Sequence, residues 1–452
     1  MQKIILLFLL GCSMFVEVSA QSSFKMFDNE LFIDGYANGQ LSRFNDSLPP
    51  SAGVTRLRTY LVTRKFTNSQ IAMIGKDLTL KVLIKAACDN YDRGGHVNLA
   101  FVPKGESTYN PDSVKRIEIA RFITPFMNKN KKPDTVPYVF EVNNVASLLS
   151  EKSILDSFDV WCELDVFGVP YAAQKEVTGC AGRIDVFLGS VEFTSTTPHT
   201  VENNNIMIAL GNQLDFNNYK ANATDAIGQT VRTLNFNLPT KTYNTKIYLI
   251  TSNHGAGTNG EEYNRRTHYV YINGRLELGY LPGFETCEPY RKYNTQGNGI
   301  YGPTPRTDAQ WQSFSNWCPG AYIPTRIINM GTMEAGLHTF KIHVPEAIFQ
   351  GADGNFPLSV YVQGKTEPVT GLTEANSRLS NITLYPNPVN DDVIKIVSDI
   401  NINHVAVYNS LGKQLFVEGS NSINVSSLAD GIYYVRIELI TGEHTVKSFI
   451  KK

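Results

Sequence analysis

The chain has 452 residues, which exceeds one small domain and predicts two or three domains. Charged residues make up 18% of the chain and the formal net charge is -1. Nucleic acids and anionic membranes attract strongly basic surfaces, so this balance argues against both as the main partner. Aromatic residues make up 11%, which suits a tyrosine-rich β-protein or a surface that stacks on sugar rings.

Residues 1–20 resemble a secretory signal peptide. Lys3 precedes an apolar run over residues 4–10, and the small residues Val18-Ser19-Ala20 predict cleavage before Gln21. The alternative is lipoprotein processing at Cys12, but the small-residue rule favours cleavage after Ala20. No other stretch is long and apolar enough for a membrane helix, so we expect export without stable membrane insertion.

The hydrophobic pattern has a period of two and predicts an all-β chain. Residues 160–167 are an example, because apolar residues alternate there with Trp161, Glu163 and Asp165. We therefore expect Glu163 to face solvent or a second domain. The pattern predicts two β-sandwiches over residues 21–189 and 190–364, a polar linker over 365–380, and a small β-unit over 381–452.

Three carboxylates lie in unusual local settings. Asp92 follows a predicted strand in the sequence CDNYDRGG, Glu163 lies on a strand, and Glu262 lies in GEEYNRRTH. Taken singly, Asp92 is better explained by a turn with a surface ion pair and Glu163 by a solvated strand residue, and Glu262 could belong to a charged loop rim. The cysteines show no CxxC spacing, so we expect no metal, and no cofactor motif appears.

Four segments in order resemble the peptide-N-glycosidase F family: CDNYDR, RFITP at residues 121–125, EYNRRTH running into YING, and WCPG at residues 317–320. The resemblance implies two adjacent eight-stranded jelly rolls with a site in the cleft between them. It implies hydrolysis of the amide bond between asparagine and the first sugar of an N-glycan, so N-glycoproteins and glycopeptides are the expected partners. The alternatives are a non-catalytic glycan-binding adhesin and an unrelated amidase or protease.

The same resemblance assigns roles to individual residues. It implies that Asp92, Glu262 and Glu163 are catalytic: Asp92 activates water, and the two glutamates orient substrate or handle protons. Arg93 would stabilise developing charge. We expect the other substrate-binding residues to be Tyr91, Asp165, Arg266, His254 and Trp311. Tyr91 and Asp165 stand where the family has tryptophans. Because the Asp92 carboxylate would serve function, we expect Asp92→Asn to leave stability nearly unchanged.

The resemblance also implies a Cys287–Cys318 disulfide. Five cysteines remain after cleavage at Ala20, so at least one thiol is unpaired within the chain. Our preferred second pair is Cys162–Cys180, which leaves Cys88 facing the core.

The last 72 residues resemble the type A sorting domain of proteins exported by type IX secretion. The resemblance is carried by LYPNP at residues 384–388, VYNSLG at 407–412 and LADGIYY at 428–434. It implies the type IX secretion machinery as a partner, and a protein that passes through the periplasm to the cell surface or the medium.

Overall fold

The computed structural model describes residues 21–452 except 217–228, 256–259, 297–306, 313, 349–353, 369–381, 391, 399–400, 410–412, 419–420 and 440–443. The predicted signal peptide and most of the predicted linker lie outside these residues. The described chain is mostly antiparallel β-structure, which confirms the all-β prediction. It divides into two compact units, residues 1–367 and 368–452. Within the described residues, no helix is long and apolar enough to cross a membrane.

The first sandwich consists of two sheets around one apolar core. One sheet has the order β1-β9-β4-β7, with β1 (Ser22–Ile33), β4 (Thr79–Ala86), β7 (Thr135–Glu141) and β9 (Asp185–Ser195). The other has the order β15-β6-β5-β8-β3-β2, with β2 (Thr55–Arg58), β3 (Leu61–Lys65), β5 (Gly94–Pro103), β6 (Lys115–Ile123), β8 (Phe158–Val166) and β15 (Tyr322–Ile323). Alternate residues of facing strands, such as Val82, Leu99 and Phe193, fill the space between the sheets.

The second sandwich follows the same principle. Its sheets have the orders β10-β18-β12-β16 and β11-β17-β13-β14. The strands are β10 (Asn205–Asp215), β11 (Val231–Leu238), β12 (Thr242–Thr251), β13 (His268–Ile272), β14 (Arg275–Tyr280), β16 (Arg326–Met333), β17 (Gly336–His343) and β18 (Pro357–Lys365). The expected boundary at 189/190 falls inside β9, which pairs with β1 as far as Ser195. The first sandwich therefore extends to residue 195.

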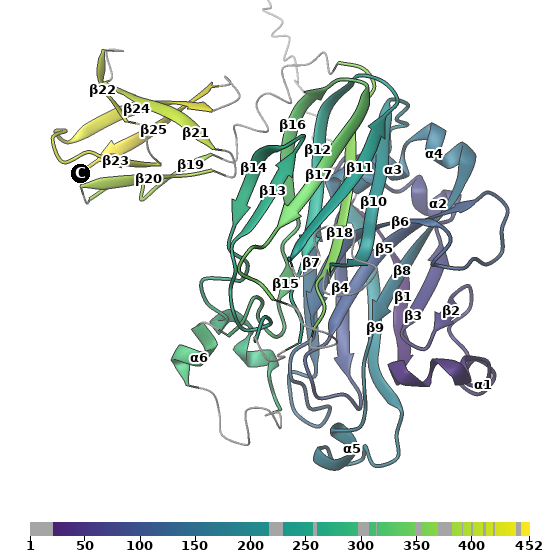
Figure 1. Cartoon of the computed structure of the whole chain (residues 1–452). Helices are drawn as coiled ribbons and strands as arrows, with labels where there is room; N and C mark the ends of the chain where they lie inside the picture. The colour runs from purple at the N-terminus through teal and green to yellow at the C-terminus, as the bar shows by residue number, and fades with distance from the viewer. Residues whose placement is uncertain are drawn as a thin grey trace, which may run out of the picture. The chain divides into compact units, whose positions relative to one another are not determined.

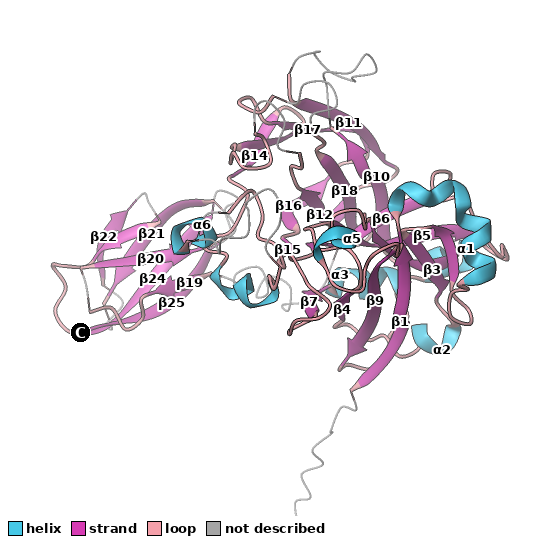
Figure 2. Ribbon diagram, turned by 90° about the horizontal axis from the view of Figure 1, so that it is seen from below, coloured by secondary structure: helices cyan, strands magenta, loops and turns pink. Residues whose placement is uncertain are grey.

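Short helices cap the two ends of the sandwiches. They are η1 (Gly35–Gln40), α1 (Leu41–Ser47), α2 (Asn68–Ile71), α3 (Asn143–Leu149), α4 (Lys152–Ser157), α5 (Ala173–Glu176), η2 (Glu288–Tyr293) and α6 (Asp308–Gln312). The segments that carry α5 and α6 lie at the same end, although one follows the first sandwich's β8 and the other belongs to the second (Figures 1 and 2). Loops from both halves of the chain therefore gather at this end.

Polar side chains join the two sandwiches. Arg121 on β6 is fully buried, and its Nη1 donates to the carbonyl of Pro357 and to Ser252 Oγ, each at 2.8 Å. Asn212 on β10 donates to Asn98 on β5 at 3.0 Å. Both contacts cross between the halves of the chain, so they fix the register of one sandwich against the other.

The second unit, residues 368–452, has its own small core. Its sheets have the orders β19-β20-β23 and β22-β21-β24-β25. The strands are β19 (Thr383–Tyr385), β20 (Val393–Val397), β21 (Ile402–Tyr408), β22 (Gln414–Glu418), β23 (Ser422–Asn424), β24 (Gly431–Leu439) and β25 (His444–Lys451). Val405, Val435 and Phe449 are buried between these sheets, so this unit has a hydrophobic core separate from those of the sandwiches.

Candidate active site

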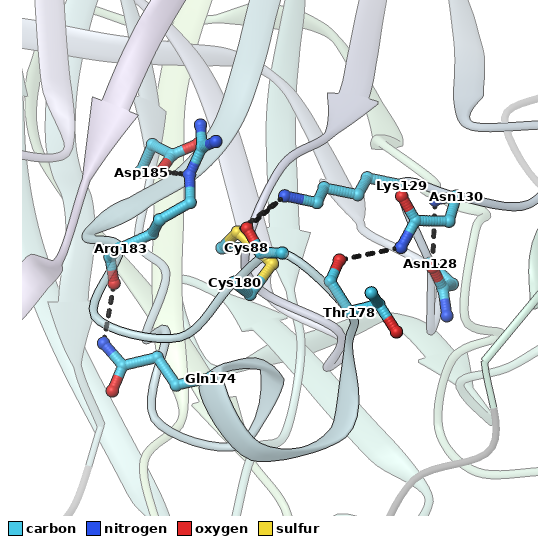
Figure 3. Close-up of a disulfide and its surroundings, with 10 residues drawn as sticks. Cys88, Asn128, Lys129, Asn130, Gln174, Thr178, Cys180, Arg183 and Asp185 are labelled. Carbon is cyan, nitrogen blue, oxygen red and sulfur yellow. Dashed lines mark hydrogen bonds and ion pairs between the residues drawn. A yellow bond between two sulfur atoms is a disulfide. The ribbon is translucent and has the colours of Figure 1, made fainter.

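A disulfide anchors the loop that carries Asp92. Cys88 ends the stretch after β4 and bonds to Cys180, which lies beyond α5 (Figure 3). The predicted Cys162–Cys180 pair was wrong, because Cys162 is buried on β8 as a free thiol. Lys129 Nζ contacts Cys88 Sγ at 3.4 Å and donates to the carbonyl of Gly179 at 2.8 Å, which ties a third segment to the bond. The second bond, Cys287–Cys318, is present as the resemblance implied.

Asp89 holds the loop in shape. Its Oδ1 accepts from the backbone N–H of Tyr91 at 2.9 Å, an Asx turn, and its Oδ2 accepts from the N–H of Val169 at 2.6 Å. The Nε of Arg93 donates to the same carboxylate at 2.7 Å. The Arg93 guanidinium also lies 5.2 Å from the centre of the Tyr91 ring. Arg93 and Tyr91 therefore support the loop, and the charge of Arg93 is matched by Asp89.

Asp92 and Glu262 form a coupled carboxylate pair. Both side chains are half-buried. Burial, followed by the negative charge of Glu262, raises the pKa of Asp92 to about 8, although Arg93 opposes the shift. Burial also raises the pKa of Glu262, opposed by the backbone N–H of Gly255, which donates to Glu262 Oε2 at 2.5 Å. With a pKa of about 8, the Asp92 carboxyl group is mostly protonated at neutral pH and ionises as the pH rises through 8.

Glu163 lies elsewhere. It pairs in register with Asn98, six residues beyond Asp92, and is fully buried, so of the two expected positions the solvent-facing one is excluded. Its carboxylate accepts from Asn98, Tyr109 and Arg116 at 2.5–3.0 Å. These partners fill its lone pairs, so Glu163 is held as part of the packed sheet face that meets the second sandwich.

Asp165 is the β8 carboxylate nearer to the loop. It lies opposite His96 in the β5–β8 register, four residues from Asp92 along β5. Burial raises the pKa of Asp165 to about 6, and the charge of Arg116 opposes the shift. In the β5–β8 register, Asp165 thus lies nearer than Glu163 to the start of β5.

The remaining expected binding residues differ in their surroundings. His254 is half-buried, and its Nε2 lies 2.7 Å from Ser252 Oγ; burial lowers the pKa of His254 to about 3, so its ring is neutral. Arg266 pairs with Glu261 at 3.2 Å. Trp311 is only 7% exposed and packs in an aromatic cluster with Phe314, so its ring supports the site from within.

Sequence analysis assigned no role to Glu118, Arg121 or His96, which the structure joins by hydrogen bonds. Glu118 and Arg121 form a fully buried double hydrogen bond, with Nε to Oε1 at 2.8 Å and Nη2 to Oε2 at 2.7 Å. His96 Nδ1 lies 2.9 Å from Glu118 Oε1. The RFITP segment was the signal that pointed to Arg121. Its partner Glu118 lies on the same strand, whereas Ser252 and Pro357 belong to the second sandwich. Among the described residues, no group of three or more His, Cys, Asp or Glu is placed to hold a metal.

Two joined sandwiches that carry two interacting carboxylates and a disulfide-anchored loop, followed by a separate β-unit, define the protein as a two-sandwich β-protein. Models of the N-terminal and C-terminal domains of peptide-N-glycosidase F match residues 37–181 and 218–363. The chain therefore belongs to the peptide-N-glycosidase F family. A secretion system C-terminal sorting domain matches residues 383–452, which implies secretion to the cell surface or the extracellular space.

A solved structure has a similar fold. The structure of PNGF-II in space group C2 is 18% identical, with a TM-score of 0.55, over 78% of this chain and 66% of that one. The chain thus spans slightly less than two thirds of that protein's length. Peptide-N-glycosidase F from Flavobacterium meningosepticum, described as a glycosylasparaginase, is 18% identical over 78% of this chain and 98% of its own, with a TM-score of 0.48. A comparison with curated protein sequences found no match.

Proposed function

We propose that the protein hydrolyses the amide bond between asparagine and the first N-acetylglucosamine of N-glycoproteins or glycopeptides. Water adds to the side-chain carbonyl carbon, the carbon–nitrogen bond breaks, and the glycan leaves as a glycosylamine while asparagine becomes aspartate. The observation that carries the proposal is the Asp92–Glu262 pair, two half-buried carboxylates whose pKa values are both raised. No cofactor takes part in this reaction.

The pair supplies the proton transfers that amide hydrolysis requires. A base works best when its pKa lies near the working pH, and a value of about 8 suits Asp92 for this role. Ionised Asp92 takes a proton from the attacking water and passes it to the departing nitrogen. Glu262, fixed by the Gly255 N–H, orients the water or the amide. Such proton transfer contributes on the order of 10²–10⁴-fold to the rate.

Arg93 contributes mainly through the loop. Because its guanidinium is engaged by Asp89, it stabilises the Asp92 loop and adds a positive field to the site. Glu163 acts at a distance by holding the sheet face. The three-carboxylate scheme expected from the family resemblance therefore becomes a two-carboxylate scheme of Asp92 and Glu262.

The experiment is incubation of the secreted protein with a denatured N-glycoprotein and with a tryptic glycopeptide. Intact-mass analysis should show loss of the glycan, and peptide sequencing should show aspartate at the glycosylated position. Release of a glycan with asparagine left intact, or with one sugar left on the peptide, would assign cleavage to a different bond. Binding without any release would support the glycan-binding alternative.

A further inference from the structure

His96, four residues after Asp92, is held by a buried ion pair. The side chain of Glu118 is fully buried, and its carboxylate accepts both Nε and Nη2 of Arg121. Ser359 also donates to Glu118 Oε2, from the other sandwich. Burial alone would raise the pKa of Glu118, but the charge of Arg121 holds it well below its usual range. Glu118 is therefore ionised.

An ionised carboxylate only accepts hydrogen bonds, which settles the tautomer of His96. Nδ1 lies 2.9 Å from Glu118 Oε1, so Nδ1 carries the hydrogen and donates it. In the neutral ring, Nε2 is then an acceptor. A histidine fixed through one nitrogen by a buried carboxylate has its other nitrogen aimed in a set direction.

The direction of Nε2 follows from Gly94. A Cβ built on Gly94 would lie 3.4 Å from His96 Nε2, and in the described chain no other heavy atom outside its sequence neighbours lies within 4 Å of that position. The imidazole therefore leans back along β5 toward Asp92, over a residue that has no side chain. The side chain of His96 is 12% exposed, so the ring retains access to solvent.

Other groups place the same ring within the site. Asp165 lies across from His96 in the β5–β8 register. Arg121, which binds the same carboxylate as His96, donates to Ser252 Oγ, and Ser252 Oγ lies 2.7 Å from His254 Nε2. His254 directly precedes Gly255, whose N–H binds Glu262. A series of hydrogen bonds therefore connects His96 with the segment that holds Glu262.

We infer that His96 is a substrate-binding residue, and that its Nε2 accepts a hydrogen bond from a hydroxyl or the acetamido N–H of the asparagine-linked sugar. Glu118 and Arg121 are positioning residues that act through His96. The open space over Gly94 admits the sugar. This inference rests on the proposed function, because it names a contact made by the substrate of that reaction.

Two conservative substitutions separate binding from structural support. The amide nitrogen of asparagine can occupy the place of Nδ1 and keep the bond to Glu118, whereas nothing remains at the place of Nε2. The longer glutamine side chain places its amide group where Nε2 was and leaves nothing at the place of Nδ1. If His96 binds substrate, His96→Asn should raise KM about tenfold, the size expected for one lost hydrogen bond, while His96→Gln retains most of the binding. A purely structural role predicts a near wild-type Asn variant and a defective Gln variant, which would overturn the inference.

A second substitution addresses the open space. Gly94→Ala adds only a methyl group at ordinary contact distance from Nε2, so the fold should tolerate it, and KM should rise because the methyl occupies the sugar's place. His199→Asn is the matched control, since His199 bonds to the carbonyl of Ile74 outside the site. KM and kcat are measured on one glycopeptide, with melting temperature as the check on folding. An unchanged KM in both His96→Asn and Gly94→Ala would overturn the inference.

A binding measurement tests the role of His96 in sugar binding independently of whether the protein cleaves the amide bond. The wild-type protein, labelled with nitrogen-15 in histidine, is titrated with the N-acetylglucosamine disaccharide of the glycan core. The Nε2 signal of His96, assigned by its absence in His96→Asn, should move on binding, and that of His199 should not. A wild type that releases no glycan but shows this shift would refute only the proposed function. Absence of the shift at saturating disaccharide would refute the role of His96.

Discussion

Replacing Asp92 by asparagine should make the protein more stable while it lowers activity. In the unfolded chain the pKa of this carboxyl group is near 3.8, and in the folded protein it rises to about 8. Between these values the folded state binds more protons than the unfolded state, so the free energy of unfolding falls as pH rises. The destabilisation is absent well below pH 3.8 and complete above about pH 8.

The magnitude follows from the same two values. The wild-type carboxyl group costs about 2 kcal/mol at pH 5, about 4 kcal/mol at pH 7 and about 5 kcal/mol at pH 8. Asparagine has nearly the same shape and never ionises, so Asp92→Asn should recover up to these amounts. The nearly unchanged stability expected from sequence alone is thus revised to a gain. Activity should fall by about 10² or more in kcat, because the proton acceptor is lost.

The assay is urea unfolding of wild type and Asp92→Asn at pH 5 and pH 8. The stability gain should be larger at pH 8. Asp77→Asn is the matched control: burial alone would raise the pKa of Asp77, but hydrogen bonds from Thr196 and Thr197 hold it below its usual range. That variant should lose stability at pH 8 and lose less at low pH. An Asp92→Asn gain that is zero, or equal at both pH values, would refute the reasoning.

Three further predictions use other parts of the molecule. The kcat/KM of the wild type should rise with pH along a limb near pH 8, as Asp92 ionises; a falling limb there would make Asp92 the acid of the pair. In the chain-entropy model the Cys88 bond, whose cysteines are 92 residues apart, contributes about 4.6 kcal/mol, and the Cys287 bond, with a separation of 31, about 3.7 kcal/mol. Urea unfolding of the serine pair variants should therefore show the larger loss for Cys88, and equal losses would contradict this order. Removal of residues 381–452 should leave both sandwich cores intact and abolish export, as judged by melting temperature and by assay of the medium; loss of soluble fold would refute it.

The sequence predicted the all-β architecture because the alternation of apolar and polar residues can be recognised within each single strand. It left the second face of β8 open, where Glu163 was expected to face solvent or a second domain, and Glu163 is in fact fully buried. Alternation separates a strand's two faces, but only the segments packed against the polar face determine whether it is covered. The cover here includes Tyr109 and Arg116, which belong to the same sandwich but lie far from Glu163 in sequence.

The disulfide error has a similar cause. Cys162 and Cys180 are closer in sequence, but the β8 register directs Cys162 into the core of the first sandwich. Cys88 and Cys180 are 92 residues apart and meet because the loops after β4 and after α5 lie at one end of that sandwich. Sequence spacing carries no information about which loops share an end.

Asp89 and Asp92 show the difference between a carboxylate that stabilises the loop and one that is available for proton transfer. In the sequence they are two aspartates three residues apart, each near Arg93, and either could be the functional one. In the structure Asp89 collects two backbone N–H groups and the guanidinium, which satisfies its charge. Burial raises the pKa of Asp89 as well, but Arg93 and these N–H groups oppose the shift. Asp92 has Glu262 near it, whose negative charge adds to the effect of burial, so the pKa of Asp92 rises to about 8. The Asp89 contacts therefore keep the loop closed, while the Asp92 carboxylate remains at a free-energy cost and is available for proton transfer.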